Sequence, residues 1–289
     1  MTRINESPKH YTLTTKSNFK IDMTLYSSDD YKDKPTILYL HGGGLLYGHR
    51  DDLPQVYIEL ILNKGYNLLS LDYPLAPEVN LKEILRSVYE TVEALINSMF
   101  DTMGLTNNNY LIFGRSAGAY LALAACKKII EKGTKPPHAL ISLYGYTGFN
   151  ADAFISPSPY YTALPRVSDA SAQSMLKNHY ITQASIEERF SLYVKARQEG
   201  TWTKYIGIDL DFDDYCVTQD DLKSFPPTIT AASTHDPDVP YRMSKSISRI
   251  VPRSKCITVY GHVHDFDRDI KNPLGLEVYE KIMTWIEQV

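Results

Sequence analysis

The segment Leu111-Ile112-Phe113-Gly114-Arg115-Ser116-Ala117-Gly118 decides the predicted fold of this 289-residue chain. An apolar run leads into a Gly-x-Ser-x-Gly pentapeptide, and an alanine-rich run follows over 117–132. These flanks predict a buried strand over 109–113 that turns sharply into a helix, with Ser116 at the turn. The turn holds the serine backbone in a strained conformation and points its hydroxyl outward. Ser116 is therefore the predicted nucleophile.

The composition is typical of a globular enzyme, with 43% hydrophobic and 22% charged residues. The net charge of −4 predicts neither a nucleic-acid partner nor a membrane surface as a partner. The cysteines Cys126, Cys216 and Cys256 are odd in number and far apart, which is typical of reduced thiols in a cytoplasmic protein. We find no apolar signal segment and no run of membrane-spanning length. We expect a cytoplasmic protein, and a homo-oligomer is one option for its assembly.

A second chemical signal is His41-Gly42-Gly43-Gly44, which follows the apolar run 36–40. Consecutive glycines let a backbone approach a substrate closely and point its N–H groups at it. Acyl transfer needs such donors for the oxyanion of the tetrahedral intermediate. A Gly-Gly-Gly run alone is more often a flexible surface loop, but its place one strand-helix-strand unit before Ser116 favours an oxyanion site. We predict that Gly42, Gly43 and Ala117 supply the N–H groups.

Strand and helix patterns alternate along most of the chain. This alternation predicts an α/β fold, with a mostly parallel sheet and helices on both faces. A hairpin over 10–14 and 19–26 is expected at the sheet edge. The other expected strands are 36–40, 66–71, 109–113, 139–144, 227–232 and 255–260, and the expected helices are 53–63, 81–100, 117–132, 241–251 and 277–288.

Residues 147–224 interrupt this alternation. The segment has prolines and tyrosines early, a helical pattern at about 185–199 and an acidic end formed by Asp209, Asp211, Asp213 and Asp214. Insertions of this kind over the top of a sheet act as lids and build the substrate pocket. An ordinary helical excursion without substrate contact is the alternative. We therefore predict a catalytic domain of residues 1–146 and 225–289 with a lid (cap) insertion of residues 147–224.

Five motifs together resemble those of the α/β-hydrolase superfamily and, more narrowly, of the carboxylesterases related to hormone-sensitive lipase. They are Gly114–Gly118, His41–Gly44, Asp72-Tyr73-Pro74-Leu75-Ala76-Pro77-Glu78, the Asp-x-x-Val-Pro segment at Asp236 and the His-x-Phe segment at His264. The resemblance covers the chain from about residue 36 to its end and is weak across the insertion. Pro74 stands where the family usually has arginine, and Ala119 where a second glycine is common. The resemblance implies an α/β-hydrolase fold.

The order of the triad in this superfamily is serine, acid, histidine. The resemblance aligns Asp236 with the acid and His264 with the base. Asp238 is the alternative acid, otherwise a carboxylate near a helix N-terminus or facing substrate, and His262 is the alternative base. A metal site built on these histidines with Asp265, Asp267 and Asp269 is disfavoured, because the triad already accounts for His264. No metal and no organic cofactor is expected.

The resemblance implies a serine carboxylesterase that forms an acyl-enzyme with a small-molecule ester. Tyr144 and Tyr146 border the insertion and are the predicted substrate-binding residues. The acidic end of the insertion and its lack of a long apolar stripe favour short, uncharged acyl groups. A peptidase or amidase of the same superfamily is one alternative, although such peptidases usually carry an additional propeller domain. A hydrolase-fold binding protein without activity is another, although it predicts a broken triad.

Overall fold

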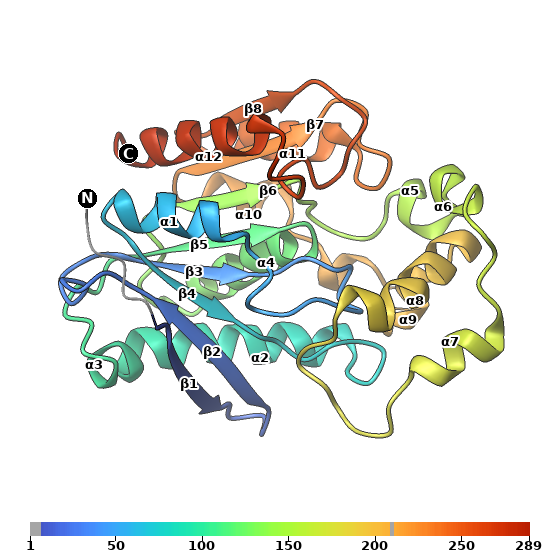
Figure 1. The fold of residues 1–289 in the computed structure, drawn as a ribbon, viewed down its shortest axis with the longest axis horizontal. Helices are drawn as coiled ribbons and strands as arrows, with labels where there is room; N and C mark the ends of the chain where they lie inside the picture. The colour runs from blue at the N-terminus through green and yellow to red at the C-terminus, as the bar shows by residue number, and fades with distance from the viewer. Residues whose placement is uncertain (1–6, 209–210) are drawn as a thin grey trace.

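The computed structural model describes residues 7–208 and 211–289, and its centre is an eight-stranded sheet (Figure 1). The strand order is β1-β2-β4-β3-β5-β6-β7-β8. Strands β3 to β8 run parallel, whereas β1 and β2 form an antiparallel hairpin and β2 pairs antiparallel with β4. The strands are β1 (Lys9–Thr14), β2 (Lys20–Tyr26), β3 (Thr36–Leu40), β4 (Asn67–Leu71), β5 (Tyr110–Arg115), β6 (Leu140–Leu143), β7 (Thr228–Ser233) and β8 (Lys255–Val259).

The parallel sheet and the edge hairpin are both as predicted. Every residue of β3, β4, β5, β6 and β7 is buried. Their sequences read as apolar runs because helices cover them on both sides. In β1, by contrast, half-buried and exposed residues alternate, because one side of this edge strand faces solvent.

Two helical layers cover the sheet. Helices α1 (Gln55–Asn63) and α12 (Pro273–Ile286) pack on one face. Helices α2 (Leu81–Ala94), α4 (Ala117–Glu131) and α11 (Tyr241–Ile250) pack on the other. The predicted helix 81–100 is interrupted by a π-helical turn at Leu95–Met99 before the short α3 (Phe100–Thr102). Helix α12 begins earlier than predicted because the side chain of Asn272 caps it, accepting from the N–H of Leu274 at 3.1 Å.

In the described residues of the connection from β6 to β7, the chain forms six α-helices and one 3₁₀ turn. Figure 1 shows α5 to α9 gathered beyond the carboxyl ends of the central strands. Sequence patterns predicted only α8, whose start is fixed by a capping box between Ser185 and Glu188. The elements are α5 (Asp152–Ile155), α6 (Pro159–Thr162), α7 (Asp169–Met175), α8 (Ile186–Glu199), α9 (Trp202–Tyr205), the turn Asp213–Tyr215 and α10 (Gln219–Lys223).

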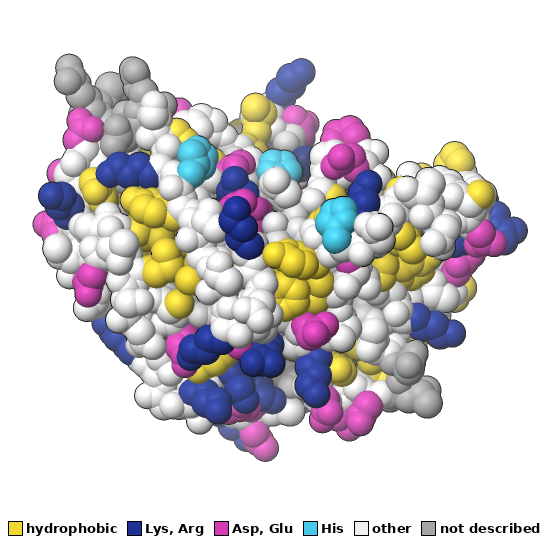
Figure 2. Space-filling view, turned by 90° about the horizontal axis from the view of Figure 1, so that it is seen from below, with side chains coloured by type: hydrophobic (Ala, Val, Ile, Leu, Met, Phe, Trp, Pro, Cys, Tyr) yellow, Lys and Arg dark blue, Asp and Glu magenta, His cyan; other side chains and the backbone are white. Residues whose placement is uncertain are grey.

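One face of the molecule, seen in Figure 2, carries interspersed basic and acidic side chains with scattered apolar ones between them. Within the described residues, no helix combines the length and the apolar character needed to cross a bilayer. Of the three cysteines, Cys126 is buried and Cys216 and Cys256 are half-buried, and none forms a disulfide.

Candidate active site

The turn between β5 and α4 holds Ser116 in a strained backbone conformation, with φ 51° and ψ −116°. Glycine is required on both sides of it because other backbone passes too close for a side chain. A Cβ atom at Gly114 would lie 2.1 Å from the carbonyl oxygen of Gly118, and one at Gly118 would lie 2.1 Å from that of Leu40. The turn therefore has the geometry expected of a nucleophile elbow.

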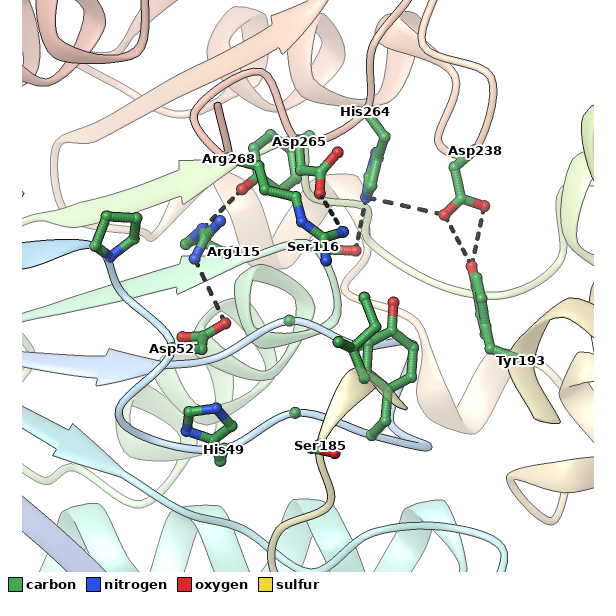
Figure 3. Close-up of a pocket in the computed structure, with 18 of the residues that line it drawn as sticks. His49, Asp52, Arg115, Ser116, Ser185, Tyr193, Asp238, His264, Asp265 and Arg268 are labelled. Carbon is green, nitrogen blue, oxygen red and sulfur yellow. Dashed lines mark hydrogen bonds and ion pairs between the residues drawn. The ribbon is translucent and has the colours of Figure 1, made fainter. Parts of the chain in front are cut away.

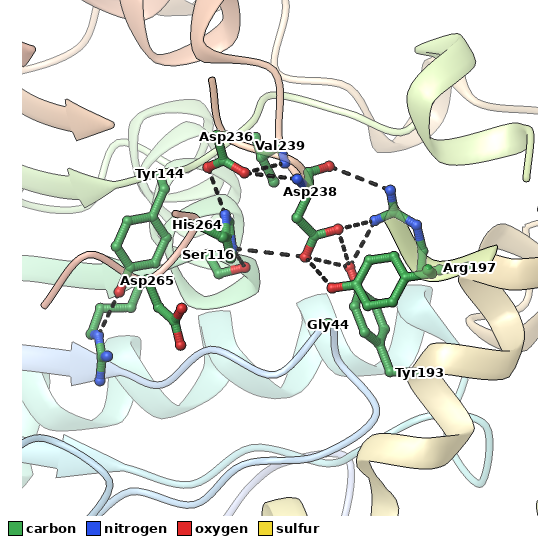
Figure 4. Close-up of polar contacts among 12 residues, drawn as sticks. Gly44, Ser116, Tyr144, Tyr193, Arg197, Asp236, Asp238, Val239, His264 and Asp265 are labelled. Carbon is green, nitrogen blue, oxygen red and sulfur yellow. Dashed lines mark hydrogen bonds and ion pairs between the residues drawn. The ribbon is translucent and has the colours of Figure 1, made fainter. Parts of the chain in front are cut away.

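Ser116, His264 and Asp236 form one hydrogen-bonded chain (Figure 4). The Oγ atom of Ser116 lies 2.8 Å from Nε2 of His264, and Nδ1 of His264 lies 2.7 Å from Oδ2 of Asp236. The other oxygen of Asp236 accepts the N–H groups of Asp238 and Val239 at 2.8 and 2.9 Å. A carboxylate only accepts, so Nδ1 carries a proton, and in the neutral ring Nε2 is then free to accept from the serine hydroxyl.

The two alternative residues lie outside this chain. The carboxylate of Asp238 approaches Nε2 of His264 only to 4.0 Å and is hydrogen-bonded to Tyr193 instead. The ring of His262 is exposed and stacks on His235, with ring centroids 4.5 Å apart. The hydrogen-bonded chain thus contains Asp236 and His264, the two residues that the family motifs aligned with the acid and the base.

The electrostatic environment favours a charged His264. Burial lowers the pKa of its imidazole, but the carboxylates of Asp236, Asp238 and Asp265 outweigh burial and raise that pKa from its ordinary value of 6.5 to about 9. The hydrogen bond to Asp236 contributes to the same increase. The surroundings of His264 therefore stabilise the imidazolium that a general base becomes.

The glycine loop lies directly beside Ser116. A Cβ atom at Gly42 would be 3.4 Å from Cβ of Ser116, and both Gly42 and Gly43 line the same cavity as the serine. Buried His41 fixes the loop: burial lowers its pKa to about 4, so the neutral ring donates from Nδ1 to the carbonyl of Gly42 at 2.8 Å. Within residues 7–208 and 211–289, the N–H groups of Gly42, Gly43 and Ala117 have no acceptor. Of these three residues, Gly42 and Gly43 line the cavity, and Ala117 directly follows Ser116.

A cavity of about 400 Å³ opens over Ser116 and His264 (Figure 3). Tyr144 lines it, with its ring centroid 4.7 Å from that of His264. The inserted segment contributes Ser185, Ile186, Glu187 and Tyr193 to its wall. Five carboxylates face two guanidinium groups in the lining: Asp51, Asp52, Glu187, Asp238 and Asp265 against Arg115 and Arg268. The cavity is therefore negatively charged.

Tyr146 does not line this cavity. Its ring is fully buried and stacks on Tyr120, with centroids 5.3 Å apart, inside a cluster with Phe149, Phe154 and Trp202. Sequence reasoning placed Tyr146 by its position beside the insertion, and spacing alone does not show which way a loop side chain turns. It also missed Tyr47 and Tyr193, which do line the cavity.

Of the acidic end of the insertion, the described residues Asp211, Asp213 and Asp214 do not line this cavity either. Asp213 and Asp214 line a separate cavity of about 580 Å³ between α2 and α4, and Asp209 lies outside the described residues. The negative charge near Ser116 comes instead from the carboxylates named above.

Arg115, the residue before Ser116, organises a buried polar network. Its Nε donates to the hydroxyl of Tyr144 at 2.8 Å and lies 3.1 Å from Oδ2 of Asp267. The hydroxyl groups of Tyr144 and Tyr279 both donate to Asp267 at 2.8 Å. The role of Asp267 in this network was not apparent from the sequence. Within the described residues, no group of three or more His, Cys, Asp or Glu side chains is arranged to hold a metal ion.

A model of the alpha/beta hydrolase fold family matches residues 37–267 of this sequence. The chain belongs to the alpha/beta hydrolase fold family. The match includes the glycine loop, the serine turn and the loops that carry Asp236 and His264. It confirms the superfamily that the motifs predicted and places the chain among hydrolases.

Solved structures agree with this membership over nearly the whole chain. A protein with unknown function from Staphylococcus aureus subsp. aureus Mu50 is 31% identical, with a TM-score of 0.87 over 97% of this chain and 99% of that one. An alpha/beta hydrolase superfamily protein from Enterococcus faecalis is 28% identical, with a TM-score of 0.86 over 99% and 100%. Carboxyl esterase 2 from Tuber melanosporum shares the fold, at 19% identity and a TM-score of 0.68 over 100% and 88%.

The curated relatives are much longer proteins. Non-reducing polyketide synthase prhL from Penicillium brasilianum is 28% identical over 154 residues, which is 50% of this chain and 6% of the synthase. The match therefore spans about 6% of that relative's length and concerns one segment of a large protein.

Proposed function

We propose that this alpha/beta hydrolase is a serine carboxylesterase that hydrolyses short-chain, uncharged esters through an acyl-enzyme. The observation that carries the proposal is the hydrogen-bonded chain from Asp236 through His264 to Ser116, which ends at a cavity. Three backbone N–H groups beside the serine, which have no acceptor within the described residues, supply the donors that acyl transfer requires. The proposal is supported by the shared fold of carboxyl esterase 2 from Tuber melanosporum.

In the proposed acylation, Nε2 of His264 removes the hydroxyl proton as Oγ of Ser116 attacks the ester carbonyl carbon. The N–H groups of Gly42, Gly43 and Ala117 hold the negative oxygen of the tetrahedral intermediate. Asp236 keeps the proton on Nδ1 and stabilises the imidazolium. The alcohol leaves with the proton from Nε2, and the carbonyl carbon stays bonded to Oγ as the acyl-enzyme.

Deacylation repeats these steps with water as the nucleophile. His264 removes a proton from water, and the resulting oxygen attacks the acyl carbon. The same three N–H groups hold the second tetrahedral intermediate. Its collapse breaks the bond to Oγ of Ser116, which regains its proton from His264, and the carboxylic acid leaves.

The size and charge of the cavity support a small, uncharged substrate. Its volume of about 400 Å³ is at the low end of ordinary ligand sites, which range over about 300–1,000 Å³. The excess of carboxylates in its lining opposes an anionic acyl group.

We also propose that the inserted segment 147–224 acts as the lid of this cavity. Four of its residues contribute to the cavity wall. It is also tied to the glycine loop, because Nε1 of Trp202 donates to the carbonyl of Gly44 at 2.9 Å. The inserted segment thus contacts both the cavity and the glycine loop that carries the predicted oxyanion site.

The test is hydrolysis of an aryl acetate by the wild type and by Ser116→Ala. We expect the turnover of the variant to fall by a factor on the order of 10⁴, because the nucleophile is lost. Ser98→Ala, at an exposed site on the π-helical turn, is the matched control and should keep wild-type turnover. An aryl phosphonate should add one covalent label to the wild type, which peptide mapping should place on Ser116. More than a tenth of wild-type turnover in folded Ser116→Ala would refute the proposal.

A further inference from the structure

A second carboxylate lies beside His264, on the side away from Asp236. Oδ2 of Asp238 is 4.0 Å from Nε2, the nitrogen that faces Ser116 (Figure 4). That distance is too long for a hydrogen bond but short enough for a strong charge interaction. Asp238 also lines the cavity, although only 5% of the residue is exposed. Neither the hydrogen-bonded chain nor the predicted oxyanion site uses this carboxylate.

The inserted segment fixes this carboxylate in place. The hydroxyl of Tyr193 donates to its two oxygens at 2.9 and 3.0 Å, and the hydroxyl of Tyr161 donates to Oδ2 at 3.1 Å. Nη1 of Arg197 donates to Oδ1 at 2.5 Å. Tyr193 and Arg197 are four residues apart on α8, so their side chains share one face of the helix. The donors hold Asp238 where it faces His264.

Arg197 is itself held rigidly. Its guanidinium lies 5.3–5.6 Å from the ring centroids of four aromatic residues, and Nη2 donates to the carbonyl of Ala153 at 2.9 Å. It contacts Oδ1, whereas Oδ2 is the oxygen that faces His264. The carboxylate of Asp238 therefore has one oxygen on Arg197 and the other toward the imidazole of His264. The four rings belong to Phe154, Tyr161, Tyr193 and Trp202.

The other charged groups around His264 also have partners, as Asp238 has in Arg197, but they differ in where they lie. Asp236 binds Nδ1, and Asp265 pairs with Arg268 at 3.2 Å. Arg115 pairs with Asp267 and with Asp52. The ring of Tyr144 packs against the imidazole, but its hydroxyl is engaged by Arg115 and Asp267. Asp238 is thus the carboxylate that lies toward the reacting side of the ring.

We propose that Asp238 is a positioning residue that stabilises the His264 imidazolium formed in each transfer step, and that Tyr161, Tyr193 and Arg197 of the insertion fix it for this role. The consequence for catalysis rests on the proposed esterase function. The charge interaction itself does not, because it exists in the resting protein. Asp238 does not exchange a proton with His264, and at 4.0 Å it acts through its electric field.

The experiment is an NMR titration of the His264 ring in the wild type and in Asp238→Asn, with the resonance assigned through His264→Gln. We expect the pKa of His264 to fall by about one unit or more in Asp238→Asn, because an opposite charge within about 4–6 Å is lost. The matched control is Glu78→Gln. The side chain of Glu78 is as well buried as that of Asp238 and also pairs with an α8 arginine, Arg189, at 3.0 Å, but Glu78 does not line the cavity. Its pKa effect on His264 should be below about 0.3 units.

The pH profile of aryl acetate hydrolysis gives the catalytic readout. In Asp238→Asn the midpoint of the acidic limb of kcat/KM should move to lower pH by the same amount as the His264 pKa measured by NMR. The value of kcat/KM on the alkaline plateau should fall by about tenfold, because the imidazolium loses stabilisation. An unchanged His264 titration in Asp238→Asn overturns this inference, whatever the esterase result. A shifted titration in a protein that hydrolyses no ester supports the charge interaction and overturns the proposed function.

If Asp238→Asn fails to fold because Arg197 is left buried without its partner, the double variant Asp238→Asn/Arg197→Gln removes both charges. The pKa of His264 should still fall, because the carboxylate is nearer to the imidazole than the guanidinium contact. A His264 titration equal to that of the wild type in the double variant counts against the inference.

Discussion

Arg115 and Asp267 form a buried ion pair, with Nε of the arginine 3.1 Å from Oδ2 of the aspartate. Arg115 directly precedes Ser116, and Asp267 lies three residues after His264. The pair therefore joins the turn that carries the serine to the loop that carries the histidine. The hydroxyl of Tyr144, the residue after β6, donates to the same carboxylate, so the end of β6 is connected to the same two loops. We expect this contact to help fix the separation between Ser116 and His264.

Asp267→Asn should reduce both stability and activity. The carboxylate is fully buried, and its removal leaves the Arg115 guanidinium without its nearest counter-charge. We expect the free energy of unfolding to fall by about 3 kcal/mol, as for other buried pairs that lose one partner. Urea unfolding measures this change. Asp269→Asn alters an exposed carboxylate two residues away and should stay within about 0.5 kcal/mol of the wild type. Equal stability of the two variants would contradict the assigned role.

The hydrogen-bonded chain predicts a large difference within two pairs of variants. His264→Ala should lower kcat/KM by about 10⁴-fold or more, whereas His262→Ala should have little effect because that ring is exposed and stacks on His235. On the alkaline plateau, Asp236→Asn should lower kcat by about 10⁴-fold by unsettling the tautomer of His264, far more than the roughly tenfold loss expected there of Asp238→Asn. Steady-state kinetics on folded variants gives both ratios. A reversed order in either pair moves the assignment to the other residue.

The pH dependence follows from the raised pKa of His264. The general base must be neutral to accept the serine proton, and its pKa in the free enzyme is about 9. We expect kcat/KM to rise about tenfold per pH unit below 9 and to level off above it, so that the value at pH 7 is about one hundredth of the plateau. A neutral aryl ester keeps the substrate from titrating. An acidic limb centred at pH 6–7 would show that the surrounding carboxylates do not raise the pKa.

The cavity predicts a preference among acyl groups. Its volume of about 400 Å³ and its carboxylate-rich lining favour short, uncharged chains. In a series of aryl esters from acetyl to palmitoyl, kcat/KM should be greatest for the short, dissolved members. A succinate monoester should react at least tenfold more slowly than the butyrate of the same chain length, because a negatively charged carboxylate replaces its terminal methyl group. Greatest efficiency on the longest chains, or a rise when substrate forms droplets, would count against this preference.

Local patterns were sufficient to predict the sheet and the serine turn. Apolar runs mark strands that helices cover on both faces, as in β3 and β5, because burial selects apolar side chains at every position. The glycines at 114 and 118 mark a close approach of backbone, which only glycine permits. An apolar run reflects burial of every residue in a strand, and the two glycines lie within two residues of the serine. Both features can therefore be recognised from a short stretch of sequence.

The short helices between β6 and β7 were not predictable in the same way. Helices α5, α6 and α9 have four residues each, too few to show a repeating apolar face. Packing rather than spacing holds them. Buried Trp202, for example, belongs to the cluster that surrounds Tyr146, which the sequence suggested for the substrate pocket.

The sequence by itself determined the alternation of strands and helices and the position of Ser116 at a sharp turn, because each depends on residues close together in the chain. The resemblance to the family supplied the alignment of Asp236 and His264. Only the tertiary structure decided what surrounds His264. Asp236 and Asp238 are two residues apart in the sequence. Their carboxylates are hydrogen-bonded to different side chains, and all of these side chains belong to residues more than 20 positions away in the sequence. His264 binds the first, whereas Tyr161, Tyr193 and Arg197 bind the second. A carboxylate is placed by the donors that fold against it, and spacing along the chain does not record which donors those are.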